Sequence, residues 1–412
     1  MLERFSLIST VANVYAYDQS TRKRGLIIVL VDNFLMTCGF FMVIRLISIH
    51  YVEGLGWTAA SIGFILAIRQ LLQQGSTPIS GVIADHIGPK RLICLGLLLR
   101  VFSFACMALA DNFPLLLFSA ILTGLAGSLF DAPLAATITT LTDAKQRSRF
   151  YSLCGVSTEL GGVIGIQLGV ILLSFNFEFT TLGAAACFGA ASLLTLIFMP
   201  SIRITGQRDR VTEGLGLALR DLRFVLYTLL LIGFWFMWVQ LTISLPLAVT
   251  EIGASNETLG LLYGISSGIS ICLGYPLLHL FSRRCSSFTL LIGGMALMAI
   301  GFGAIALFHN VALLGVCVVI VTIGVLLAMP SQRTVAAQLA HPEWLGSYLG
   351  LNAIAQGVGG ALGNYSGGLL HDVGKQIHFT ALPWLVFFLV GILATSGLWL
   401  LAHYRPAKEA KT

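Results

Sequence analysis

Twelve long apolar runs dominate the sequence, and no other feature restricts its fold as strongly. A helix needs about 20 apolar residues to cross ~30 Å of hydrocarbon, and each run is about that long. The runs lie at 25–49, 58–82, 91–110, 114–139, 149–173, 179–200, 223–249, 258–281, 287–308, 311–337, 346–370 and 381–403. Charged residues make up only 10% of the chain, whereas a soluble domain has roughly 25%. The sequence therefore predicts an all-α integral membrane protein with twelve transmembrane helices.

Polar stretches separate these runs into two groups of six. The predicted parts are an N-terminal segment at 1–21, an N-terminal half at 22–200, a linker at 201–221, a C-terminal half at 222–404 and a tail at 405–412. If successive helices alternate in direction, 20 of the 24 Lys and Arg residues fall on one side of the membrane and only Lys375 falls on the other. Because cytoplasmic loops carry the excess of Lys and Arg, we expect both termini and the linker to be cytoplasmic.

The two halves show an internal repeat with an offset of 197–198 residues. Pro133 corresponds to Pro330, and Tyr151 corresponds to Tyr348. A glycine series repeats as well: Gly161, Gly162, Gly165 and Gly169 match Gly359, Gly360, Gly363 and Gly367. Chance similarity among Gly-, Ala- and Leu-rich helices is the alternative explanation. Two like-oriented halves are typical of transporters that rock around a central site.

The loop after the second run reads GVIADHIGPKR over residues 81–91. Glycine lets two helix ends approach closely. An acid beside a helix end, followed by a basic pair, can form ion pairs in one conformational state of the protein and break them in another. The candidate gating residues are Gly81, Asp85, Gly88, Lys90 and Arg91.

This loop resembles the signature between the second and third helices of the major facilitator superfamily, commonly written G-x-L-A-D-R-x-G-R-K-R. It departs from that signature at His86 and Pro89, where basic residues are usual. The resemblance implies the twelve-helix major facilitator fold. It also implies secondary active transport by alternating access, with the first, fourth, seventh and tenth helices lining the cavity.

Within the superfamily, the chain is most similar to the drug:proton antiporter branch and to the MdtH-type exporters in it. The similarity rests on Asp32-Asn33, Arg69-Gln70 and residues 130–133. Ala120 stands where the branch has an arginine in its fourth helix, and the fifth-helix motif lacks its Gly-Pro pair. The resemblance implies proton-coupled multidrug efflux of amphipathic small molecules across a bacterial inner membrane. The expected partners are a small-molecule substrate, protons and the lipid bilayer, with no nucleic acid, and the chain is expected to be a monomer.

Apart from Arg91 and Arg149, which begin their runs, six charged residues fall inside the apolar runs of the N-terminal half. They are Asp32, Arg45, Arg69, Arg100, Asp131 and Glu159. Each costs about 2.5–3.5 kcal/mol near a helix centre, so such residues are retained for a function. We expect Asp32 and Glu159 to exchange protons during transport, and Asp131 to act in a charge relay with the Asp85 loop. The alternative is that these acids form static pairs that fix the helix register.

The three arginines are the expected charge partners of these acids. Arg69 either binds an anionic group of the substrate or neutralises Asp32 or Glu159, and the second role is favoured. Arg100 is expected to be structural, because the third helix of this architecture is usually peripheral. Arg45 stands where an uncharged residue or proline would be expected.

Polar and aromatic residues on three helices are the substrate-binding candidates. Trp235 and Trp238 share a helix face, and together with Gln240 they suit planar or cationic compounds. Asn352 and Gln356 form a polar stripe, and Gln73 extends a similar stripe one turn from Arg69. The alternatives are lipid-facing packing for the tryptophans and hydrogen bonds between helices for the amides.

The sequence shows no nucleotide-binding loop, metal-binding motif or catalytic nucleophile, so we expect no cofactor, no metal and no enzyme activity. The leading hypothesis is a proton-coupled exporter. Alternatives are a dedicated exporter of an anionic or zwitterionic metabolite such as a siderophore, and a major facilitator importer or uniporter. A membrane enzyme or a scaffold is disfavoured, because neither needs costly charges within the membrane.

Overall fold

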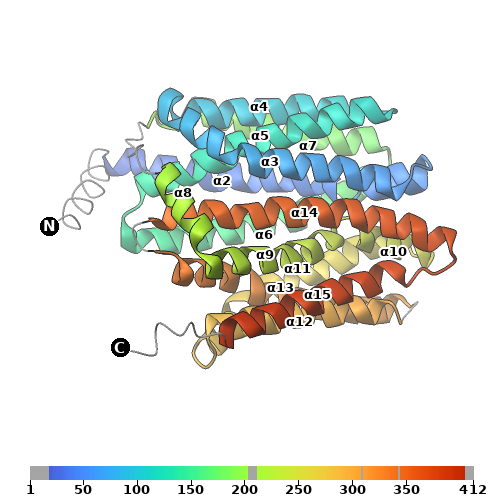
Figure 1. Cartoon of the computed structure of the whole chain (residues 1–412). Helices are drawn as coiled ribbons and strands as arrows, with labels where there is room; N and C mark the ends of the chain where they lie inside the picture. The colour runs from blue at the N-terminus through green and yellow to red at the C-terminus, as the bar shows by residue number, and fades with distance from the viewer. Residues whose placement is uncertain (1–17, 203–210, 308–309, 342–343, 404–412) are drawn as a thin grey trace. The chain divides into compact units, whose positions relative to one another are not determined.

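The computed structural model describes residues 18–202, 211–307, 310–341 and 344–403, and these are helical with no strand. Twelve long helices match the twelve predicted runs, so the all-α transmembrane prediction is confirmed. They are α2 (Gln19–Ile44), α3 (Ala59–Ile87), α4 (Pro89–Ala108), α5 (Phe113–Leu141), α6 (Ala144–Leu173), α7 (Phe177–Phe198), α9 (Leu222–Trp238), α11 (Asn256–Ser282), α12 (Ser287–Ile305), α13 (Val311–Leu339), α14 (Leu345–Gln376) and α15 (Leu382–His403) (Figure 1). The predicted segments at 405–412 and most of 1–21 lie outside the described residues.

Four short helices complete the described chain. The π-helix η1 (Ile49–Gly54) follows α2, and α8 (Val211–Arg220) precedes α9. The 3-10 helix η2 (Val239–Leu241) and α10 (Ser244–Glu251) follow α9. The seventh predicted run, 223–249, is therefore divided into three helical pieces.

Ten of the helices are long and apolar enough to be identified as membrane spans by length and hydropathy, and α3 and α14 are the two long helices that are not. Both carry polar residues along their length. Among these, Arg69 and Gln70 on α3 and Asn352 and Asn364 on α14 are all buried. These four polar residues therefore face protein.

Helix contacts divide the chain into two compact units. Unit 1 comprises Met1–Leu46 and Leu72–Gln207, and unit 2 comprises Ile47–Leu71 and Arg208–Thr412. Helix α3 contributes its first part to unit 2, where it packs on α14, and its second part to unit 1, where it packs on α5. The chain segment after α2 thus belongs to the same unit as the C-terminal helices.

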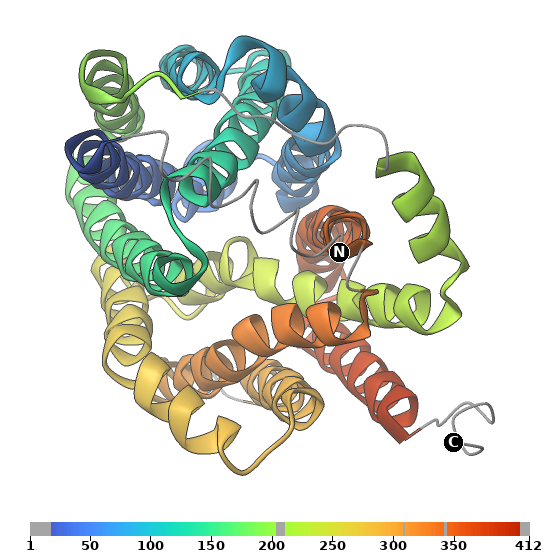
Figure 2. The same ribbon diagram turned by 90° about the vertical axis from the view of Figure 1, so that its left-hand side faces the viewer.

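The same packing pattern occurs in both units. In unit 1, α2 packs on α6 and α7, and α4 packs on α5 and α7; in unit 2, α9 packs on α14 and α15, and α12 packs on α13 and α15. Figure 2 shows the helices of unit 1, coloured blue to green, nearly end on. The two capping residues Asn112 and Asn310, at the starts of α5 and α13, are 198 positions apart. The predicted repeat is therefore present in the packing as well as in the sequence.

Glycines allow backbone contact at the equivalent helix pairs α2–α6 and α9–α14. A Cβ atom on Gly165 would lie 2.2 Å from the carbonyl oxygen of Cys38, and one on Gly363 would lie 2.6 Å from that of Phe236. Both distances are far below van der Waals contact, so no other residue fits without moving a helix. Close approach at small residues is how helices associate in lipid, where the hydrophobic effect does not drive them together.

We predict that Gly165→Ala destabilises the protein whereas Gly155→Ala, on the same helix, does not. Overpacking at Gly165 should cost about 1–3 kcal/mol. A Cβ atom on Gly155 meets no described atom within 4 Å. Thermal unfolding in detergent should show a clearly lower midpoint for Gly165→Ala alone. Equal midpoints for the two variants would contradict the proposed role of Gly165.

Candidate functional site

Asp32 lies on α2 and is completely buried. The hydroxyl of Thr195 on α7 donates to its Oδ2 atom at 2.5 Å. Within the described ranges, its Oδ1 atom has no hydrogen-bond partner. The next residue, Asn33, donates to Thr158 Oγ1 at 2.8 Å and to the carbonyl oxygen of Cys154 at 3.1 Å, both on α6. Asp32 is thus held in place by its neighbours but keeps an acceptor oxygen available for a proton.

Glu159 and Arg45 form a second charged group in unit 1. Arg45 is the C-cap of α2 and is 9% exposed. Its guanidinium lies 5.1 Å from the ring centroid of Phe41. Arg45 also acts electrostatically on Glu159, which occupies an exposed position on α6. Among the predicted charge partners, Arg45 is therefore associated with Glu159.

Asp131 is associated with one candidate substrate ligand and one candidate charge partner. Gln73 donates through Nε2 to Asp131 Oδ2 at 2.8 Å. Arg100 acts electrostatically on Asp131 and is 1% exposed. Its guanidinium lies 5.5 Å from the ring centroids of both Phe40 and Phe188. Arg100 is therefore enclosed by aromatic rings inside unit 1, and its structural role stays a prediction.

The predicted gating motif lies at the junction of α3 and α4. Gly88 precedes α4 with a φ of 92°, a backbone conformation that favours glycine, and Pro89 occupies the first turn of the helix. At Gly81, by contrast, a Cβ atom would meet no described atom within 4 Å. The close approach expected at the motif glycines therefore does not apply to Gly81. Lys90 is half-buried and Arg91 is exposed, whereas the side chain of Asp85 lies outside the described part.

Arg69 lies on the first part of α3, in unit 2. It is 7% exposed and donates to Gln70 Oε1 at 2.8 Å. Gln70 in turn donates to the backbone carbonyl of Gln356 on α14 at 3.5 Å. Arg69 is thus next to the contact between α3 and α14, and its proposed partnership with Asp32 or Glu159 stays a prediction.

The two tryptophans of α9 contact each other, with ring centroids 5.6 Å apart and planes at 75°. Trp235 is 5% exposed and packs near Gly359 of α14, so it does not face lipid. Its indole Nε1 has no hydrogen-bond partner among the described residues. Trp238 is half-buried. Trp235 and Trp238 together provide two adjoining aromatic rings, and the indole N–H of Trp235 is a hydrogen-bond donor without a partner among the described residues.

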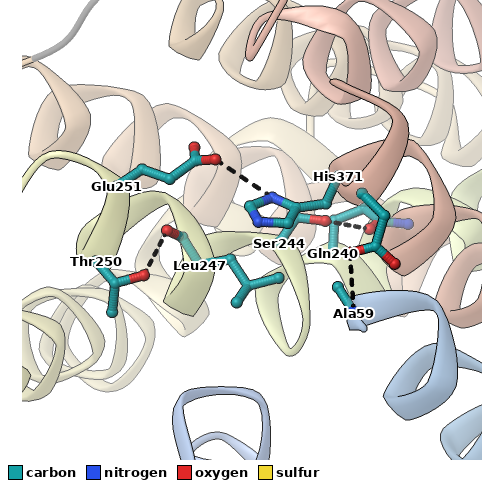
Figure 3. Close-up of polar contacts among 8 residues, drawn as sticks. Ala59, Gln240, Ser244, Leu247, Thr250, Glu251 and His371 are labelled. Atoms are coloured by element: carbon teal, nitrogen blue, oxygen red, sulfur yellow. Dashed lines mark hydrogen bonds and ion pairs between the residues drawn. The ribbon is translucent and has the colours of Figure 1, made fainter. Parts of the chain in front are cut away.

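The candidate amide side chains differ in how many of their donor and acceptor atoms already have a hydrogen-bond partner. Gln240 accepts from Ser244 at 2.8 Å (Figure 3). It donates to the carbonyl oxygens of Phe236 at 2.9 Å and Gly363 at 3.0 Å. Asn352 donates to Gln332 Oε1 at 3.2 Å, and its Oδ1 atom has no partner within the described ranges. The geometry therefore favours a packing role for Gln240 and leaves acceptor capacity at Asn352.

Sequence reasoning did not select Thr195, Glu251, His371 or Asp372. Thr195 is one of four hydroxyl residues in a largely apolar helix, and only its contact with Asp32 makes it notable. Glu251, His371 and Asp372 follow directly after predicted apolar runs, where charged residues are ordinary. Their pairing could not be inferred from the sequence pattern.

Comparison with known proteins shows which proteins this chain resembles. A sequence model of the Major Facilitator Superfamily matches residues 30–364. Multidrug resistance protein MdtH of Yersinia pestis (strain Pestoides F) is 37% identical over 395 residues, which cover 96% of this chain and 98% of that protein. The same protein of Yersinia pseudotuberculosis serotype O:1b (strain IP 31758) has the same identity and coverage.

Solved transporter structures share the fold at low sequence identity. A mutant form of the nucleoside transporter NupG superimposes with a TM-score of 0.79 at 13% identity, covering 91% of this chain and 99% of that one. A bacterial homolog of the human lysosomal transporter Spinster, inward-facing and unoccupied, gives 0.80 at 13% identity, covering 95% and 100%. These likenesses confirm the twelve-helix architecture.

We predict that Gln240→Met lowers the unfolding midpoint in detergent, whereas Gln356→Met leaves it nearly unchanged. The first change leaves the buried carbonyl of Gly363 without its donor, at a cost of about 1–3 kcal/mol. The hydrogen bond made by Gln356 uses its backbone carbonyl, which the substitution keeps. A substrate affinity per folded molecule that falls in Gln240→Met without loss of stability would instead identify Gln240 as a ligand.

Proposed function

Because the chain belongs to the major facilitator superfamily, we propose that it couples proton entry to the export of amphipathic small molecules. It is a multi-pass membrane transporter that acts on small molecules. The bacterial inner membrane as its location, protons as the coupling ion, multidrug efflux and the monomeric state belong to the proposal. The names of the relatives that are 37% identical to this chain support it.

The distribution of Lys and Arg supports the orientation we propose. With 20 of these residues on one side and Lys375 on the other, both termini and the linker face the cytoplasm. The end of unit 2 that contains the start of α3, the end of α10 and the end of α14 then faces the outer compartment.

The burial of Asp32 is the observation that carries the coupling proposal. A buried carboxylate is costly unless it is paired with a positive charge. In the described residues, Asp32 receives its hydrogen bond from a hydroxyl and not from a guanidinium. Protonation removes the charge, and a movement that admits water restores it. Asp32 is therefore the group that we expect to exchange a proton in each transport cycle.

Glu159 and Asp131 are the second and third proposed coupling residues. Arg45 acts on Glu159, and Arg100 and Gln73 act on Asp131. An acid whose positive neighbour changes distance during the cycle binds a proton in one state and releases it in another. We place Asp131 in a relay with the Asp85 loop.

The aromatic rings of Trp235 and Trp238 and the acceptor oxygen of Asn352, which has no partner among the described residues, support the proposal that the substrate is planar or cationic. Aromatic faces attract cations and stack on flat rings. Gln73, Gln240 and Gln356 stay weaker candidates, since Gln73 is bonded to Asp131 and Gln240 to helix carbonyls.

We predict that Asp32→Asn abolishes substrate-driven proton flux in liposomes, because the amide is isosteric but takes up no proton at physiological pH. Glu159→Gln and Asp131→Asn should each reduce the flux. Glu178→Gln serves as the control, because Glu178 is an exposed acid in the first turn of α7. The readout is the internal pH after a cationic dye is added outside.

Unchanged flux in Asp32→Asn would remove Asp32 from the mechanism. Transport in inverted vesicles, with and without an imposed pH gradient, tests the direction and the substrate class. Accumulation of anionic metabolites in place of cationic dyes would favour the dedicated exporter, and transport insensitive to the gradient would favour a uniporter.

A further inference from the structure

A charged cluster in unit 2 is distinct from the intramembrane acids of unit 1. It lies where α10 ends, α3 begins and α14 approaches its end. Glu251 and His371 face each other across this point (Figure 3). Asp372 follows His371 in the chain, and Glu53 on η1 and Lys375 on α14 act on the pair electrostatically.

The Glu251 and His371 side chains are close enough to form an ion pair when His371 is protonated. Glu251 Oε1 lies 3.6 Å from His371 Nδ1. The His371 side chain is 7% exposed and that of Glu251 is 26% exposed. Burial raises the pKa of Glu251, Lys375 opposes that shift and Glu53 reinforces it. Glu251 therefore takes up its proton at a higher pH than an exposed glutamate does.

Glu251 also lines a cavity. The cavity has a volume of about 120 Å³, and its lining includes Glu251, Ala248, Leu314, Thr380 and Trp384. That volume holds several water molecules. Glu251 thus contacts both a cavity large enough for water and a buried imidazole.

Asp372, beside this pair, holds the first turn of α3. Its Oδ1 atom accepts from the backbone N–H of Ala59 at 3.0 Å, and its Oδ2 atom accepts from that of Ala60 at 2.8 Å. Both N–H groups belong to the positive end of the helix dipole, so a carboxylate is stabilising there. A single residue of α14 therefore caps the helix that continues into unit 1.

We propose that Glu251 and His371 form a proton-binding site, and that a proton bound there loosens the Asp372 cap on α3. Each added proton raises the net charge of the pair by one unit, either by neutralising Glu251 or by making His371 a cation. The surroundings of Asp372 thereby become more positive and compete with the positive end of α3 for the same carboxylate. By linkage, release of α3 from α14 increases the proton affinity of the site. In the proposed orientation the site faces the outer compartment, from which an antiporter takes its protons.

This inference goes beyond the proposed function, because it does not require Asp32, Glu159 or Asp131 to carry the coupled proton. Hydrogen–deuterium exchange of the full chain in detergent, without substrate or gradient, tests it separately. The signal is the exchange rate of the first turn of α3. The reference is the first turn of α13, which the neutral residue Asn310 caps through Ala312 N–H at 2.8 Å. The ratio of the two rates removes the intrinsic pH dependence of exchange.

In the wild type, the ratio should rise about fivefold between about pH 7.5 and about pH 5.5, as expected for one charge at a helix end. The Glu251→Gln/His371→Gln double variant should lose most of this response, and His371→Gln alone should reduce it. Asp372→Ala, which removes both acceptor oxygens, should give fast exchange at α3 at both pH values, which shows that the signal reports the cap. Unchanged exchange at α13 shows that each variant is folded.

Three results would overturn the proposal. They are a wild-type ratio that does not depend on pH, a full pH response in His371→Gln and the double variant, and normal protection of α3 in Asp372→Ala. If the double variant does not fold, His371→Gln decides the question, because it removes the basic member of the pair. Loss of proton coupling in Asp32→Asn would leave all of these results unchanged.

Discussion

Hydrocarbon offers no hydrogen bonds, so every polar group of a membrane-spanning chain must find its partner inside the protein. Helices satisfy the backbone in this way, but they do not by themselves hold one helix against another. The glycines at 165 and 363 let the carbonyl oxygens of Cys38 and Phe236 approach the neighbouring helix directly. Close contact at glycine occurs at equivalent positions and produces the same packing in both units. Within each unit, this contact also fixes how near the polar side chains of the two helices lie to each other.

The same constraint separates polar residues that stabilise the fold from those available for transport. Gln240 has both donor and acceptor atoms occupied by helix partners, so nothing is gained by adding a ligand. Asp32 has one oxygen bonded and one without a partner among the described residues, and that imbalance is costly in a buried position. A group held in an unsatisfied state is best explained by a state of the cycle in which a proton or water satisfies it.

The spans could be predicted because the length of an apolar run is a local property of the sequence. Even α3 and α14 were recognised, since their polar residues are interspersed with small and apolar ones. The break between α9 and α10 was not predicted, because the residues at 239–243 contain neither glycine nor a charge that would indicate a turn. The hydrogen-bond partners of side chains could not be predicted for a different reason. Gln73 and Asp131 are 58 residues apart, and contacts between such distant residues depend on how whole helices pack. The sequence therefore identified Asp131 and Gln73 as notable but could not pair them.

The repeat also provides an internal comparison for the charged residues. At an offset of 198, Asp32 corresponds to Leu230 and Arg100 corresponds to Met298. Asp131 corresponds to Ala328 if the prolines are aligned and to Met329 if the helix ends are aligned. Unit 2 achieves the same helix packing with apolar residues at these positions. Charge is thus not needed to build a six-helix half of this kind, and the cost of keeping it in unit 1 must be offset by something other than packing. The proposed movement of a proton past these residues agrees with the burial of Asp32 and Arg100 and with the transport family to which the chain belongs.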